Sequence, residues 1–182
     1  MDGIELEYWD SCVFLALLQK EPHRDGELQY LEQQARKFDI GALGIVTSSI
    51  TITEVFEARL SDENKVKFRS MYTRSNFEFF DANVGICQIA SEIRGYYKNN
   101  PIDGFYPSTP DAIHVASAIA AQSATKNGLL LITFDDENKK KEKEVGLTKM
   151  SGLVANKYNL TICRPPLKNL QAGLFQSGNN DQ

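Results

Sequence analysis

The chain has 182 residues, 42% of them hydrophobic, and a formal net charge of −4. These values are ordinary for a globular protein that is large enough to bury a core. The acidic balance excludes a simple polybasic nucleic-acid binder. It does not exclude a nuclease, because acids that hold metal ions lower the formal charge while the ions supply a positive field.

Strands and helices alternate along most of the chain. Periodicity and capping residues predict strands at residues 4–8, 45–47, 77–80, 129–133 and 158–163, and helices at 11–20, 28–38, 48–60, 61–73, 81–98 and 109–127. The charged run 139–144 is expected to be a solvated loop or helix face. The alternation predicts an α/β fold with three layers, α/β/α, around a mostly parallel central sheet.

The N-terminal residues and the cysteines indicate in which cellular compartment the protein is expected. Residues 1–5 are acidic where a signal peptide would be basic, and the apolar run 13–18 is too short to span a bilayer. The three cysteines are widely spaced and form no C-x-x-C pair, which is typical of free thiols in a reducing compartment. We expect a cytoplasmic protein with no membrane contact, a single domain over residues 1–170 and a frayed tail over 171–182.

The helix predicted from residue 109 differs from the others because small or apolar residues surround it almost completely. Thr109 is a good N-cap and Pro110 suits the first helical position. Such a helix is buried within a domain rather than exposed on its surface. Its first turn nevertheless carries Asp111, and His114 follows three residues later. An acid at the start of a buried helix suggests a functional site.

Three further acids follow predicted strands or open the next helix: Asp10, Glu54 and Asp135. In parallel α/β sheets, ligands bind beyond the carboxyl ends of the strands, where these residues would meet Asp111. Each acid also has a simpler structural interpretation. Asp10 could be an N-cap, Glu54 could close a capping box with Thr51, Asp111 could oppose the helix dipole, and Asp135 could be a turn residue.

Taken together, the four acids favour a metal site. Carboxylates gathered at one edge of a sheet would repel one another strongly unless a cation bound between them. Their ligand atoms are all hard oxygens, so Mg²⁺ or Mn²⁺ is the expected ion and Zn²⁺ is not. A metal ion held in this way can activate water and stabilise charge on a phosphodiester.

Four segments of the chain resemble the PIN-domain family, and within it the VapC-type toxin ribonucleases. These segments are residues 8–15 (YWDSCVFL), 49–55 (SITITEV), 110–116 (PDAIHVA) and 131–135 (LITFD). The resemblance implies Mg²⁺- or Mn²⁺-dependent cleavage of RNA that leaves a 5′-phosphate. It also implies a small antitoxin protein as partner and a homodimer.

The resemblance assigns roles to individual residues. By position, Asp10, Glu54 and Asp111 match the family's three central metal-binding acids, and Asp135 matches the fourth. Two hydroxyl residues, Ser11 and Thr133, match positions that support these acids. The sequence departs from the family where Asp135-Asp136-Glu137 replaces an acid-plus-aromatic pattern, which makes Asp136 the alternative fourth ligand. The chain is also longer than compact toxins of this type, with extra length around residues 59–76 and 98–108.

Other residues have two interpretations each. His114 could contact phosphate or orient a ligand, although a core or packing histidine is the more common use of such a position. Cys12 lies beside Asp10 but has no evident base partner, so we interpret it as a packing residue. The segment from 59 to 74 could bind an RNA backbone and stack bases, or it could be a solvated helix face. Its basic residues are Arg59, Lys65, Lys67, Arg69 and Arg74, with Phe68 and Tyr72 among them.

The sequence therefore predicts a metal-dependent endoribonuclease, the toxin of a toxin–antitoxin pair. The first alternative is a catalytically silent PIN-like module that binds RNA or a protein. The second, less favoured, is a receiver-type signalling domain, which is also a doubly wound sheet with acids at its strand ends. A receiver needs paired acids after its first strand, whereas Asp10 stands alone there.

Overall fold

The computed structural model describes residues 4–21, 24–125 and 128–166. Its strands are β1 (Glu5–Trp9), β2 (Leu43–Ser48), β3 (Phe77–Phe80), β4 (Leu130–Ile132) and β5 (Thr161–Cys163). Its helices are α1 (Ser11–Gln19), α2 (Glu27–Asp39), α3 (Ile50–Glu57), α4 (Asp62–Tyr72), α5 (Val84–Asn99), α6 (Thr109–Ala124), the short 3-10 helix η1 (Leu147–Met150) and α7 (Ser151–Tyr158). The predicted tail and the predicted domain boundary at residue 170 lie outside the described residues.

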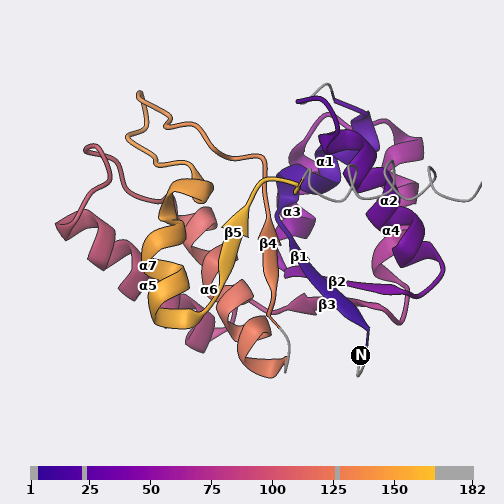
Figure 1. Cartoon of the computed structure of the whole chain (residues 1–182). Helices are drawn as coiled ribbons and strands as arrows, with labels where there is room; N and C mark the ends of the chain where they lie inside the picture. The colour runs from indigo at the N-terminus through magenta and orange to yellow at the C-terminus, as the bar shows by residue number, and fades with distance from the viewer. Residues whose placement is uncertain (1–3, 22–23, 126–127, 167–182) are drawn as a thin grey trace, which may run out of the picture.

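The five strands form one parallel sheet in the order β3-β2-β1-β4-β5 (Figure 1). In the centre of the sheet, Tyr8 of β1 lies opposite Val46 of β2 and Leu131 of β4. Receiver domains have the order 2-1-3-4-5, so this topology excludes the receiver interpretation. Because all strands are parallel, their carboxyl ends share one edge of the sheet.

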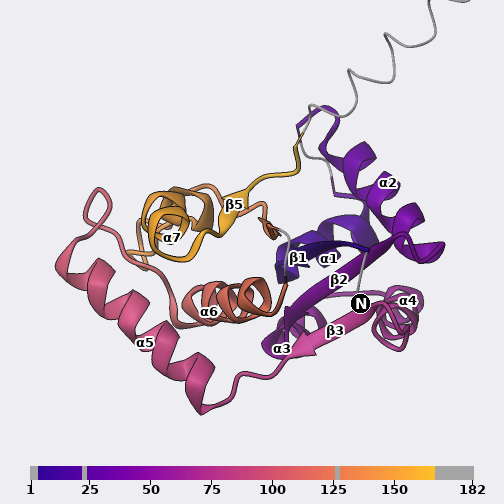
Figure 2. The same cartoon turned by 60° about the horizontal axis from the view of Figure 1, so that its bottom comes forward.

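Helices cover both faces of the sheet, which confirms the three-layer prediction. Figure 2 shows α5, α6 and α7 on one face and α1, α2 and α4 on the other. Neighbouring residues of β1 point in opposite directions: Tyr8 belongs to the apolar cluster beneath α5–α7, whereas Trp9 belongs to the cluster beneath α1–α4. Both faces of a central parallel strand are therefore buried, as its side chains require.

The caps of two helices differ from those predicted by one or two residues. Ser108, not Thr109, is the N-cap of α6, because its backbone is extended and its hydroxyl accepts a hydrogen bond from the amide of Asp111. Asn83, not Asp81, caps α5, since its side-chain oxygen accepts from the amide of Ile86. Serine and asparagine are both favoured N-cap residues. The predicted caps were therefore of the right kind, but were placed one and two residues away from the observed ones.

The last helix was not predicted, and the last strand is shorter than predicted. Residues 151–158 form α7, and β5 begins only at Thr161. The buried residues of η1 and α7 are Leu147, Met150 and Val154, whose spacing is that of a helix. Asn159, in a left-handed conformation with φ of 53°, then ends α7. No helix in the described part of the chain is long and apolar enough to cross a membrane.

The charged run 139–144 forms a surface loop. The sequence predicted either a solvated loop or a helix face there. The backbone amides of Lys139 and Glu144 each donate to the carbonyl of the other, at 2.8 and 3.2 Å. Residues 139–143 are exposed, and Glu144 is half-buried. The loop therefore folds back on itself at the surface between β4 and η1.

The core beneath α2 contains a charged side chain, Glu7 of β1, which is 1% exposed. Its carboxylate accepts hydrogen bonds from the indole nitrogen of Trp9, at 2.8 Å, and from the side chains of Tyr30 and Gln34 in α2. A buried carboxylate is tolerated only where such donors replace water. The contacts therefore fix α2 against the first strand through polar groups in an otherwise apolar layer.

Replacement of Glu7 should test this arrangement. Glu7→Ala removes the shared acceptor of three buried donors, of which, among the described residues, only Gln34 keeps another partner, the hydroxyl of Tyr30. We therefore expect it to lower the free energy of unfolding by about 3 kcal/mol in urea titrations. The control is Glu5→Ala, two residues earlier on the same strand, where an exposed ion pair with Lys37 is lost. That change should cost less than about 0.5 kcal/mol. Equal effects of the two substitutions would contradict this account of the core.

Candidate functional site

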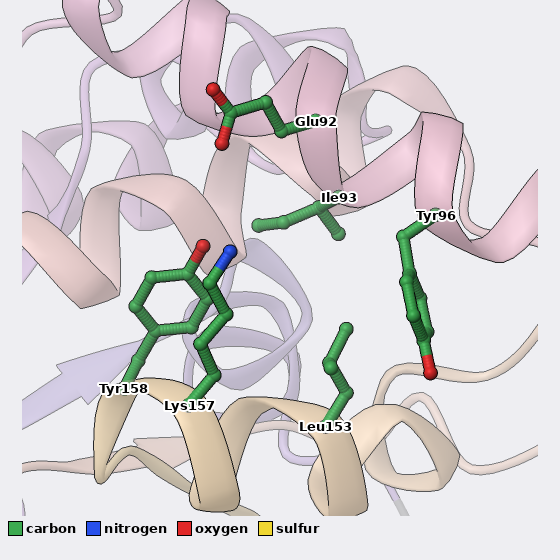
Figure 3. A pocket seen from close by; sticks show the side chains of 6 residues that line it. All are labelled: Glu92, Ile93, Tyr96, Leu153, Lys157 and Tyr158. Atoms are coloured by element: carbon green, nitrogen blue, oxygen red, sulfur yellow. The ribbon is translucent and has the colours of Figure 1, made fainter.

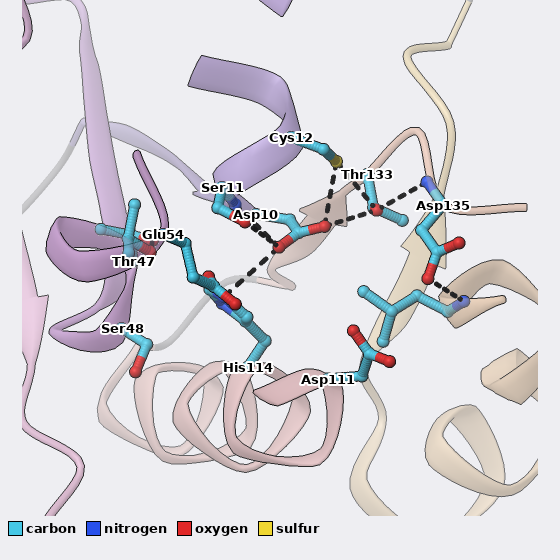
Figure 4. Close-up of polar contacts among 12 residues, drawn as sticks. Asp10, Ser11, Cys12, Thr47, Ser48, Glu54, Asp111, His114, Thr133 and Asp135 are labelled. Carbon is cyan, nitrogen blue, oxygen red and sulfur yellow. Dashed lines mark hydrogen bonds and ion pairs between the residues drawn. The ribbon is translucent and has the colours of Figure 1, made fainter. Parts of the chain in front are cut away.

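Asp10 lies at the carboxyl end of β1, where the chain turns into α1, and its side chain is 6% exposed. One carboxylate oxygen accepts from the amide and the hydroxyl of Ser11, at 2.7 and 3.3 Å. The other accepts from the hydroxyl of Thr133, at 2.8 Å, and from the thiol of Cys12, at 3.0 Å. Asp10 is thus an N-cap and is also held in one orientation by donors from two elements (Figure 4).

Cys12 supports Asp10 as a protonated thiol that donates a hydrogen bond, and not as a thiolate. Burial, together with the nearby Asp10 carboxylate, raises the pKa of its thiol well above the usual value. Its sulfur also accepts from the amide of Phe134, at 3.2 Å. A protonated, buried thiol is a poor nucleophile, in agreement with the structural role expected from the sequence.

Glu54 and His114 meet beside Asp10, although they come from α3 and α6. The Nε2 atom of His114 lies 2.8 Å from a Glu54 carboxylate oxygen and 3.4 Å from Asp10 Oδ1. Its Nδ1 atom lies 2.9 Å from the hydroxyl of Tyr8. Burial disfavours protonation of His114, but the charges of Asp10 and Glu54 outweigh it and raise the pKa of the ring.

These contacts revise two interpretations made from the sequence. His114 is a core residue, 1% exposed, yet it also faces the acids, so the two alternatives for it are not exclusive. The capping box of Glu54 with Thr51 is wrong. The N-cap of α3 is Ser49, which makes no side-chain capping bond, and the hydroxyl of Thr51 instead lies 2.7 Å from that of Thr47.

Among the residues that the structure describes, Asp10, Glu54 and His114 form the group that could hold a metal ion, with one ligand atom of each within 4.8 Å of the others. Ligands on opposite sides of an octahedral ion at about 2.1 Å lie about 4.2 Å apart. Small side-chain rotations would therefore bring these three atoms onto one ion. The donors are two oxygens and a nitrogen, whereas the sequence predicted oxygens alone.

Asp111 and Asp135 lie outside this group of three but beside it. In Figure 4 they are on the side of Asp10 away from Glu54. Burial and the charge of Asp10 raise the pKa of Asp111. Burial and the charge of Asp111 raise the pKa of Asp135 to about 6. The four acids predicted from the sequence therefore share one edge of the sheet, and Asp10, Asp111 and Asp135 interact electrostatically.

The loop after β4 holds Asp135 in place. The amide of Leu147 donates to its carboxylate at 3.4 Å, and the amide of Thr148 donates to its backbone carbonyl at 3.1 Å. Gly146 makes this approach possible, because a Cβ atom there would lie 2.7 Å from the backbone carbon of Asp136. Only glycine fits such close contact without a shift of the backbone.

Asp136 makes different contacts from Asp135. Its carboxylate pairs with Arg24 at 2.7 Å and with Arg164 at 2.9 Å.

Lys139, which sequence reasoning did not select, is closer to the acids. Its ammonium group pairs with Glu144 at 3.6 Å, and its charge lowers the pKa values of Asp111 and Asp135 against the larger effect of burial. No motif in the sequence indicated this position, because the loop folds back only in three dimensions.

The basic segment around α4 makes mostly local contacts. The pairs are Lys65 with Asp62 at 3.3 Å, Lys67 with Glu63 at 2.7 Å and Arg74 with Asp39 at 3.1 Å, while Arg69 lies over the ring of Phe56 and Arg59 is exposed. Phe68 is completely buried, so it cannot stack on a base. Tyr72 packs against Phe68 and Phe79. These contacts are typical of a solvated helix face with an apolar inner side.

A small pocket of about 190 Å³ lies between α5 and α7 (Figure 3). Its lining consists of Glu92, Ile93, Tyr96, Leu153, Lys157 and Tyr158. It shares no residue with the acidic edge and presents one acid and one amine among apolar and aromatic groups. We therefore place the functional site at the acidic edge.

The raised pKa of Asp135 predicts how stability depends on pH. Its carboxyl holds a proton more tightly in the folded chain than in the unfolded chain, so the penalty for ionisation grows as pH rises from about 4 to 6 and is complete above that range. With chelator present, Asp135→Asn should stabilise the protein at pH 7.5 by about 1–2 kcal/mol, after allowance for solvent screening, and by much less at pH 4.5.

Urea titrations at the two pH values would measure this difference. Asp136→Asn is the matched control, because it removes a neighbouring acid that pairs with two arginines, and it should give no gain. A gain from Asp135→Asn that is the same at both pH values would contradict the ionisation of a buried carboxyl beside Asp111 as its cause.

Comparisons with known proteins agree with this geometry. A family model of the PIN domain matches residues 8–144. No curated protein sequence matches the chain. A chain in the structure of VapBC2 from Rickettsia felis bound to a DNA fragment from their promoter is similar, with a TM-score of 0.52, 18% identity and coverage of 87% of this chain and 98% of that one. A chain of DNA-bound VapBC from Salmonella typhimurium has a TM-score of 0.50, 14% identity and coverage of 90% and 99%.

The two solved structures support the fold, and the family model covers most of the chain, from the middle of β1 to the loop after β4. The matched span contains every acid at the edge of the sheet. The chain belongs to the PIN-domain family, whose members are generally nucleases.

Proposed function

We propose that the chain is a divalent-metal-dependent endoribonuclease in which Asp10, Glu54, Asp111 and Asp135 bind the metal. The observation that carries the proposal is the convergence of these acids, from four separate segments, on the carboxyl edge of one parallel sheet. The pKa values of Asp111 and Asp135 are raised, first because both side chains are largely buried and then because neighbouring acids repel them. A bound cation would remove that repulsion.

Mg²⁺ or Mn²⁺, when bound, would polarise the scissile phosphate and lower the pKa of water. The residues of the chain supply the frame for this chemistry. The hydrogen bonds from Ser11, Cys12 and Thr133 fix the direction of the Asp10 carboxylate. The side chain of Glu54 is 29% exposed and is therefore more accessible than that of Asp10, which is 6% exposed.

We assign the fourth acid to Asp135 rather than to Asp136. Asp135 shares the electrostatic field of Asp10 and Asp111, whereas the carboxylate of Asp136 is neutralised by Arg24 and Arg164. A ligand must give up its other partners to bind a metal, and a doubly paired carboxylate does so at a greater cost. Contact between RNA and the basic residues in and beside α4 stays a prediction. Most of these residues already pair with nearby acids.

We further propose that the chain is the toxin of a toxin–antitoxin pair and that a small antitoxin protein binds it. The support is the similarity of fold to chains in two VapBC structures. Induced expression in a bacterial host should then arrest growth, and Asp111→Asn should remove the arrest. Arrest by both forms would instead favour a module that acts by binding alone.

Cleavage of a single-stranded RNA tests the nuclease assignment. The wild-type chain should cut the RNA with Mn²⁺ or Mg²⁺ and lose activity with chelator. Asp111→Asn should lower the rate at least about 100-fold, because it removes one metal-binding charge while keeping the shape of the side chain. Gel analysis of end-labelled RNA would measure both effects, and the products should carry a 5′-phosphate.

The matched control is Asp81→Asn, an acid that follows β3 at the same edge of the sheet but is exposed and outside the acid cluster. It should cut RNA at close to the wild-type rate. Full divalent-dependent cleavage by Asp111→Asn would show that the site assignment is wrong. Absence of cleavage by the wild-type chain with either ion would favour the silent binding module.

A further inference from the structure

We propose that His114 is itself a metal ligand through Nε2, and that the site therefore prefers first-row transition ions such as Mn²⁺ over Mg²⁺. This inference rests on the proposed function, because it assumes that the acidic edge binds a divalent ion. It differs from the all-oxygen set of ligands that the sequence and the family resemblance imply.

The position of Nε2 is the first argument. It lies 2.8 Å from a Glu54 oxygen and 3.4 Å from Asp10 Oδ1, so it points between the two carboxylates rather than past them. An ion that bound both acids would displace the Glu54 contact and meet the nitrogen at the same point. His114 belongs to the tightly buried helix α6 and is 1% exposed, so its ring has little room to turn away.

The other face of the ring is the second argument. A histidine that binds a metal through one nitrogen normally donates the proton of the other to a fixed acceptor. The Nδ1 atom of His114 lies 2.9 Å from the hydroxyl of Tyr8, which is completely buried at the centre of β1. The hydroxyl of Ser117 lies beside this hydroxyl, and because it donates its own proton to the hydroxyl of Ser48 at 3.1 Å, its oxygen can accept the proton of Tyr8. Tyr8 can therefore accept from Nδ1 and leave the lone pair of Nε2 for an ion.

The donor set then decides the class of ion. Mg²⁺ prefers oxygen ligands in a strict octahedron, and it keeps several waters. Imidazole nitrogen suits transition ions better, while the carboxylates of Asp10 and Glu54 remain good ligands for Mn²⁺. One buried nitrogen among the oxygens thus shifts the preference away from Mg²⁺ without making a closed zinc site of thiolates and histidines.

Pulsed electron paramagnetic resonance of bound Mn²⁺ can detect this nitrogen directly. The full chain, free of any affinity tag, is loaded with one equivalent of Mn²⁺, and the electron spin-echo decay is recorded for ¹⁴N modulation. The chain has only two histidines, so His23→Gln is a matched control for His114→Gln. We expect modulation in the wild type and in His23→Gln, and its loss in His114→Gln.

Calorimetric titration gives a second measure that does not depend on activity. His114→Gln should weaken Mn²⁺ binding by about tenfold or more and Mg²⁺ binding by less than about threefold. If His114→Gln does not fold, modulation in both the wild type and His23→Gln still assigns the nitrogen to His114.

Three results would overturn the inference. Bound Mn²⁺ without ¹⁴N modulation in the wild type would show that no histidine coordinates it, while RNA cleavage with Mn²⁺ would leave the nuclease proposal standing. Modulation that survives in His114→Gln and disappears in His23→Gln would place the ion elsewhere. Failure of the wild type to bind Mn²⁺ at all would overturn both this inference and the proposed metal site.

Discussion

The arrangement of the site depends on how one carboxylate, that of Asp10, is held at the end of the central strand. Four hydrogen bonds from Ser11, Cys12 and Thr133 reach it, from the start of α1 and from the residue that follows β4. A nearly buried acid needs such donors, and they also remove its freedom to rotate. Glu54 and His114 then approach a fixed oxygen, so the geometry of the group follows from the sheet itself.

Much of this could be predicted from the sequence because the signals are local. Alternation and apolar runs located the five strands, and the chain order placed Asp10, Glu54, Asp111 and Asp135 just beyond strand ends or in the first turn of a helix. Parallel pairing then carries them to one edge, whatever the details of packing. The buried character of α6 was also evident, since small and apolar residues occupy nearly all of its surface.

What could not be predicted depends on contacts between distant segments. The helix α7 was missed because Gly152 and several polar residues interrupt a short apolar pattern that tertiary packing stabilises. The contact of His114 with Tyr8 joins residues 106 positions apart, so no local pattern in the sequence could indicate it. The position of Lys139 depends in the same way on how a surface loop closes, which no periodicity records.

Arg164, just after the last strand, contacts the segment that carries Asp135. It forms a two-pronged pair with buried Glu27 at 2.7 and 2.8 Å, donates to the carbonyl of Phe134 at 3.1 Å and pairs with Asp136. Arg164 thus connects the residues immediately before and after Asp135 to Glu27 of α2. Loss of the Arg164 contacts would therefore loosen the segment that carries Asp135 without any change in Asp135 itself.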